Sequence, residues 1–79
     1  MNGEKVYAFE RNENQEIRLT LKEYKNKKYI DIRIFFQPKD EPDMKPTKKG
    51  ITITVGQLGE LAKGLKQLSQ FVREEEIVS

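Results

Sequence analysis

The sequence predicts an α+β domain in which four antiparallel β-strands are followed by one C-terminal helix. Up to Thr54, apolar and polar residues alternate with a period of two, which is typical of half-buried strands. After Thr54 the apolar residues recur every three or four positions, as they do on one face of an α-helix. The 79 residues suffice for a single domain, 1–79, with one core.

The first three strands are separated by turn chemistry. A first strand is expected over residues 6–11, and the asparagine-rich residues 12–14 then form a turn. Apolar and polar residues alternate cleanly over residues 17–24 and 29–36. The short polar run 25–27 between them is expected to form a tight turn. Two alternating runs joined by so short a turn predict a β-hairpin.

Three prolines interrupt the pattern after the hairpin. They fall within residues 37–49, which therefore predict a loop, with 39–43 as its centre. A short fourth strand is expected over residues 50–54, where isoleucine and threonine alternate.

The C-terminal quarter has the signals of a helix. Thr54 and Gln57 have the spacing of a capping box, so the helix is expected over residues 55–73. Glutamates 74–76 oppose the helix dipole, and residues 74–79 are expected to form a frayed acidic tail. We expect the helix to cover one face of the sheet and leave the other face polar and basic. The apolar stripe that would be buried, as core or as a dimer interface, is Leu58, Leu61, Leu65, Leu68 and Val72.

The composition argues against an enzyme. The chain has no cysteine and no histidine, which removes thiol nucleophiles, disulfides, the usual general base and the commonest metal ligand. We expect no metal, no other cofactor and no small-molecule substrate. No aliphatic or aromatic run is longer than four residues, so no membrane partner is expected either. A chain this short without disulfides or metals favours a homodimer.

Charge is concentrated in the centre of the chain. Residues 22–49 hold nine basic and five acidic residues, whereas the rest of the chain holds six basic and eight acidic residues. A polyanion-binding surface needs such an asymmetry, although an ordinary solvated loop region can show it too.

Two runs of residues carry a family resemblance. KEYKNKKYIDIR at residues 22–33, read with Phe36, is similar to the central hairpin of the single-stranded-DNA-binding transcriptional coactivator family called positive cofactor four. MKPTKKGITI at residues 44–53 resembles the family's Met-Lys-Pro-x-basic-Lys-Gly run before its last strand. The resemblance covers about residues 17–68.

The resemblance implies a fold and an activity. It implies a strongly curved four-stranded sheet, a homodimer with helices at the interface, paired channels for two antiparallel single strands of DNA, and no catalysis. Thr47 stands where the family has glycine, so the approach of DNA to the backbone there is expected to differ. The family's eukaryotic serine-rich tail is absent, which favours a stand-alone bacterial or viral protein. A bacterial protein is expected in the cytoplasm, associated with the nucleoid, and a eukaryotic one in the nucleus.

The expected interface combines cations for phosphates with aromatic rings for bases. Lysine holds a phosphate without reading sequence, and any base can stack on a ring. Strand parity places Phe36 with the isoleucines of the core face, although a bulge near Ile34 would move it to the other face. Phe36 is therefore either part of the core or a stacking platform. The candidate nucleic-acid-binding residues are Lys22, Tyr24, Lys25, Lys27, Arg33, Phe36, Lys45, Lys48 and Lys49.

The leading prediction is thus non-specific binding of single-stranded DNA by a homodimer, in transcription regulation or in DNA replication and repair. Two alternatives remain open. One is an RNA-binding protein on the same scaffold, and the other is a helix-mediated protein-interaction module that does not bind nucleic acid.

Overall fold

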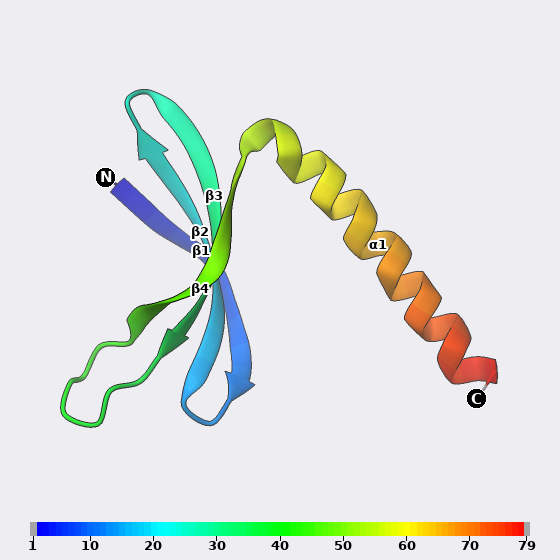
Figure 1. Cartoon of the computed structure of the whole chain (residues 1–79), viewed down its shortest axis with the longest axis horizontal. Coiled ribbons are helices and arrows are strands. Elements are labelled where there is room, and N and C mark those ends of the chain that lie inside the picture. The colour runs from blue at the N-terminus through cyan, green and yellow to red at the C-terminus, as the bar shows by residue number, and fades with distance from the viewer. Residues whose placement is uncertain (1, 79) are drawn as a thin grey trace.

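The computed structural model describes the backbone of residues 2–78 as a four-stranded antiparallel sheet followed by a helix (Figure 1). The strands lie in the order β1-β2-β3-β4, and Figure 1 shows them strongly twisted, with their ends splayed apart. This confirms the predicted element order and topology. The elements are β1 (Asn2–Asn12), β2 (Gln15–Tyr24), β3 (Lys27–Phe36), β4 (Lys45–Thr54) and α1 (Val55–Val78).

Three predicted boundaries were wrong by four residues or more. β1 begins at Asn2 and β4 at Lys45, so residues 45–49, expected in the loop, belong to a strand. Pro46 is tolerated there because β4 is an edge strand, with no further strand to pair its outer side. The helix continues beyond residue 73 to Val78, since no proline or glycine follows Gly64 to end it.

The local turn and cap predictions are confirmed. Lys25 and Asn26 form a two-residue turn with φ of 51° and 64°, the positive values that suit the right-handed twist of a hairpin. At the start of α1, the Gln57 N–H donates to Thr54 Oγ1 at 3.2 Å. In return, the Thr54 N–H donates to Gln57 Oε1 at 3.0 Å, which completes the capping box.

A bulge at Val6 changes the face on which β1 residues lie. Lys5 pairs with Thr20, and the next paired residue, Tyr7, faces Leu19. Because a bulge inserts one residue, Lys5 lies on the polar face of the sheet whereas Tyr7 lies on the apolar face.

A further irregularity lies in β4 and leaves the β3 parity intact. β2 and β3 pair without interruption along their whole length. In the β3–β4 pairing, Arg33 faces Gly50 and Phe35 faces Pro46, so the extra residues are in β4. Phe36 therefore stays on the same side as Ile34, as strand alternation predicts, and Phe35 belongs to the polar face.

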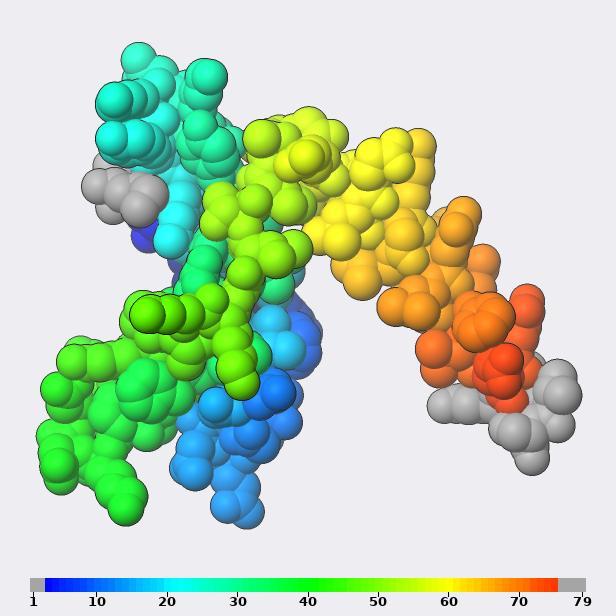
Figure 2. All heavy atoms as spheres, viewed as in Figure 1, coloured from blue at the N-terminus to red at the C-terminus, as the bar shows by residue number. Residues whose placement is uncertain are grey.

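The helix does not cover its own sheet, which corrects the prediction. β4 passes into α1 without a loop, so the helix cannot fold back, and Figure 2 shows it as an arm directed away from the sheet. Leu65 and Leu68 are 56% and 57% exposed. Among the described side chains, those classed as buried are Ile30 and Asp31 alone. Across residues 2–78, no helix is long and apolar enough to cross a bilayer.

Candidate nucleic-acid interface

The polar face of the sheet forms a groove of about 660 Å³ that residues of all four strands line. Alternation along β2 and β3 and the bulge in β1 bring basic side chains from separate strands to this one face. The charged residues that line the groove are the cations Lys5, Arg18, Lys22, Arg33 and Lys48 and the carboxylate Asp31.

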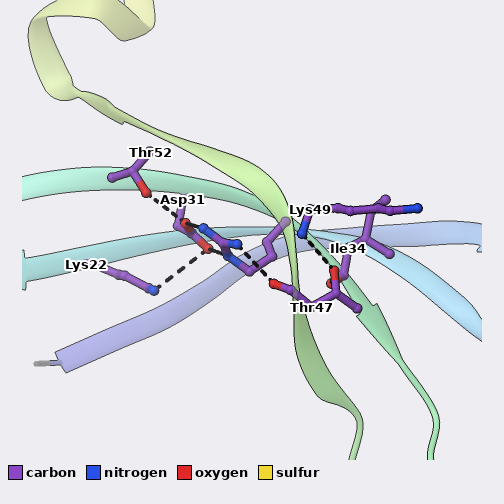
Figure 3. A network of polar contacts seen from close by, with 7 residues as sticks. Lys22, Asp31, Ile34, Thr47, Lys49 and Thr52 are labelled. Atoms are coloured by element: carbon purple, nitrogen blue, oxygen red, sulfur yellow. Dashed lines mark hydrogen bonds and ion pairs between the residues drawn. The ribbon is translucent and has the colours of Figure 1, made fainter.

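Asp31 organises the floor of the groove (Figure 3). The residue is only 2% exposed. Arg33 binds it with two hydrogen bonds, from Nε to Oδ2 and from Nη2 to Oδ1, each 3.0 Å long. Thr52 Oγ1 donates to Oδ1 at 3.0 Å, and Lys22 Nζ lies 3.7 Å from Oδ2. The carboxylate thus ties together β2, β3 and β4.

These contacts keep Asp31 ionised. Burial alone would raise the pKa of this carboxyl, but the hydrogen bonds from Arg33 and Thr52 and the charges of Lys22 and Arg33 together lower it below its ordinary value. The hydrogen bonding to Asp31 in turn raises the pKa of Arg33. The groove is therefore lined by five cations, two of which are held in place by one buried carboxylate.

Thr47 pins the irregular part of β4 to β3. Its hydroxyl donates to the Ile34 carbonyl at 2.7 Å and accepts the Lys49 N–H at 3.2 Å. Its own carbonyl accepts a hydrogen bond from Arg33 Nη1 at 3.0 Å. Thr47 thus has a structural role, because it fixes the strand from which Lys48 reaches the groove.

Gly50 allows β4 to approach β3 closely next to this point. A Cβ atom at this position would lie 2.7 Å from the Ile32 carbonyl oxygen and 3.0 Å from the Arg33 Cα. Because both neighbours are backbone atoms, any side chain here would push the strands apart.

The structure brings six of the predicted residues to one continuous surface. Lys22, Arg33 and Lys48 line the groove. Tyr24, Lys25 and Lys27 lie at the β2–β3 turn, and alternation along β2 places Tyr24 on the same face as Lys22. The Tyr24 side chain is open to solvent, with Lys25 Nζ 5.3 Å from its ring centroid.

The other three predicted residues lie apart from the groove. Phe36, 38% exposed, lines a hollow of about 530 Å³ that adjoins the groove at Thr47. Lys45 Nζ pairs with Glu41 Oε2 at 2.7 Å. Lys49 turns to the apolar face, where it lines a hollow together with isoleucines such as Ile34 (Figure 3).

Three cationic or aromatic residues that line the groove were missed by the sequence reasoning. Lys5 reaches the polar face only through the bulge at Val6, which no sequence signal announces. Arg18 and Phe35 were detectable, because alternation already places both on the polar side of their strands.

The geometry suits an extended polyanion. In the part of the chain that the structure describes, no group of three or more acidic, cysteine or histidine residues has a metal-binding arrangement. The groove offers cations of several strands and an aromatic ring at one end, which are the two elements of single-strand binding sites.

Comparison with known proteins agrees with this picture. Residues 11–64, more than half of the chain, match the family model described as Transcriptional Coactivator p15 (PC4). The comparison with curated proteins found no match.

Solved structures with the same fold include three informative relatives. The chain is similar to BPSL1147, a PC4 homologue from Burkholderia pseudomallei, at 28% identity and a TM-score of 0.78, over 86% of this chain and 90% of that one. It is similar to MoSub1 in a complex with single-stranded DNA at 26% identity and a TM-score of 0.59, over 86% and 77% of the two chains. A third similar structure is the bacteriophage T5 homologue of PC4, which is implicated in recombination-dependent DNA replication. The match has 21% identity and a TM-score of 0.58 over 96% of this chain and 81% of that one, and it shows the fold alone.

Proposed function

The chain belongs to the PC4 family, and on that premise we propose that it is a homodimer that binds single-stranded DNA with little base preference. The observation that carries the proposal is the groove, because five cations from four strands line one face that continues to the exposed ring of Tyr24. The complex of the relative MoSub1 with single-stranded DNA supports it.

The proposed mechanism has two parts and involves no chemical reaction. Lysines along the groove and at the β2–β3 turn neutralise phosphates and release their counterions, a contribution that does not depend on sequence. Tyr24 stacks on bases at the end of the polar face, and Phe36 does so in the hollow that adjoins the groove at Thr47. Stacking favours unpaired strands because the bases of a duplex present no free face. Binding only the unpaired form would also promote duplex opening by mass action.

A second copy of the chain is the proposed cover for the apolar surfaces. Ile51 on the sheet and Leu65 on the helix are each more than half exposed, and so large an apolar area is costly in a soluble protein. Apart from the backbone of their own helix and their chain neighbours, no atom of the described residues would lie within 4 Å of a Cβ at Gly59 or Gly64, which leaves room for another backbone. In such a dimer Lys49, beside the apolar face, and Lys45 would border DNA channels that both copies form.

The biological setting follows from the family at a coarse level. We propose a role in transcription regulation or in DNA replication and repair, at the nucleoid of a bacterial cell or in a eukaryotic nucleus. The phage T5 homologue is implicated in replication, and the family name refers to transcription.

The test is a salt titration of binding to single-stranded DNA, duplex DNA and RNA of one sequence. Single-stranded DNA should bind most tightly, and log affinity should fall linearly with log salt by about 0.7 per phosphate neutralised. Lys48→Ala should make that slope shallower by about 0.7. Lys63→Ala, on the helix and 76% exposed, is the matched control that should leave it unchanged.

Three outcomes would contradict the proposal. Tighter binding to RNA would favour the RNA-binding alternative. Equal binding to duplex would remove the role of base stacking. Absence of salt-dependent binding in a folded protein would favour the protein-interaction module.

A further inference from the structure

We propose that Arg18 and Phe35 together form a stacking platform for one base, at a subsite of the groove distinct from Tyr24. This inference rests on the proposed binding of single-stranded DNA. Arg18 and Phe35 both line the groove, and strand alternation places both on the polar face of the sheet.

The first observation is the geometry of the pair. The Arg18 Cζ lies 4.0 Å from the centroid of the Phe35 ring, well inside the range of a cation–π contact. The Arg18 Nε also donates to Glu16 Oε2 at 2.7 Å. A ring on one side and a carboxylate at one edge hold the guanidinium plane in a fixed orientation, so little further entropy is lost when a ligand stacks on it.

The second observation is the position of the pair in the groove. Arg18 and Phe35 both line it, and Pro46 of β4 faces Phe35 across the strands and lines it as well. The Arg18 side chain keeps 22% of its surface exposed, whereas the guanidinium covers the ring of Phe35. A base that enters here therefore meets the planar guanidinium, and bases stack on arginine planes as they do on aromatic rings.

The third observation concerns charge. Glu16, with its side chain 20% exposed, already pairs with Arg18 and offsets its positive charge. A residue whose charge is neutralised by a neighbour contributes little to phosphate binding. Lys48 differs, because it forms no ion pair with any of the residues that the structure describes. The plane of Arg18, more than its charge, is what this site offers to a nucleic acid.

The subsite is separate from Tyr24. Tyr24 and Arg18 are six positions apart on β2, which corresponds to about 20 Å along a strand. One base cannot contact both, so the two platforms would hold different bases of the same strand. Effects of changing the two residues should therefore add.

The experiment uses Arg18→Lys, which keeps the positive charge and removes the plane. Affinity of the full chain for a thymidine homopolymer should fall by about 5- to 150-fold, the range of one lost stack, with the salt slope unchanged. On an abasic oligonucleotide of the same length the variant and the original protein should bind equally. Phe35→Leu, which removes the ring that supports Arg18, should show the same pattern, and Arg73→Lys on the helix is the matched control.

Each outcome has a defined meaning. If the original protein binds single-stranded DNA and Arg18→Lys, folded by circular dichroism, binds it equally well, the platform is refuted while the proposed function stands. If Arg18→Lys has no effect but Arg18→Ala makes the salt slope shallower, Arg18 contacts a phosphate and the stacking role is wrong. If the original protein does not bind single-stranded DNA at all, the proposed function fails and the platform with it.

Discussion

The two faces of the sheet differ in how far a single chain can bury and pair their side chains. On the polar face, Asp31 is 2% exposed and its hydrogen-bond and ion-pair partners all come from the same chain. On the apolar side, Ile51 remains 52% exposed and the helix stripe is open at Leu65. On the polar face a single chain therefore buries the carboxylate and supplies its partners, whereas the apolar surfaces still need a covering layer.

The difference has a physical cause. Residues two apart on one strand or opposite each other on neighbouring strands can form a hydrogen-bonded network, so Arg33 and Thr52 reach Asp31 without any further element. Burying an apolar sheet face requires a second layer packed on it. Because α1 leaves the end of β4 without a loop, this layer cannot come from the chain's own helix.

Leu65→Ala should have the largest effect if a second copy supplies the missing layer. In the single chain Leu65 is 56% exposed, and its truncation would cost little. Buried in a dimer, the same change should lower the free energy of unfolding by about 2–5 kcal/mol. Chemical denaturation at several protein concentrations measures this, and the midpoint should rise with concentration. A small, concentration-independent loss would mean that the stripe stays open to solvent.

Asp31→Ala should have the next largest effect, on the polar face. It leaves Arg33 and Thr52 without their shared acceptor, and breaking such a buried pair should cost about 3 kcal/mol of unfolding free energy. Thr20→Ala, opposite Asp31 on β2, is a control that leaves the carboxylate in place. Equal destabilisation by the two changes would argue against the network.

The pH dependence gives a milder form of the same test. The pKa of Asp31 is lowered in the folded state, so its ionised form stabilises the fold at neutral pH. This stabilisation should begin to disappear as the pH falls below about 4, the ordinary pKa of aspartate, and be lost as the pH passes the folded value. Thermal unfolding across this range should show a smaller acid-induced loss in Asp31→Asn than in the original protein.

Tyr24→Ala should weaken DNA binding without unfolding the protein. The ring is 50% exposed at the end of the polar face, so its loss removes one stack worth about 1–3 kcal/mol. The slope of log affinity against log salt should stay nearly constant, because no phosphate contact is lost. A shallower slope would show that Tyr24 acts mainly by placing Lys25, whose ammonium lies 5.3 Å from its ring.

Gly64→Ala should have the smallest effect on the free energy of unfolding, and the sign of that effect is informative. In the single chain no described residue outside the helix's own backbone lies within 4 Å of a Cβ at this position, so alanine should stabilise the helix by about 1 kcal/mol. If another copy's backbone packs there, the same change should instead destabilise the dimer. Comparing the unfolding midpoints of the two proteins decides between these packings.

Several features of the fold followed from sequence alone because their causes are local. The two-residue turn at Lys25 and Asn26 and the capping box of Thr54 and Gln57 depend on residues at most three positions apart. Strand alternation also placed Tyr24, Lys22 and Arg33 on one face. These are the parts of the candidate site that a period of two can predict.

Tertiary structure decided the rest. The bulge at Val6, which brings Lys5 into the groove, and the irregularity in β4, which separates Lys48 from Lys49, depend on how two strands pair, and pairing is not encoded in either strand by itself. The direction of α1 likewise depends on a connection of no residues between Thr54 and Val55. Sequence determined the alternation of apolar and polar residues, since this needs only neighbours along the chain. Which cations share a groove, and which apolar surfaces stay uncovered, was fixed only when separate strands came together.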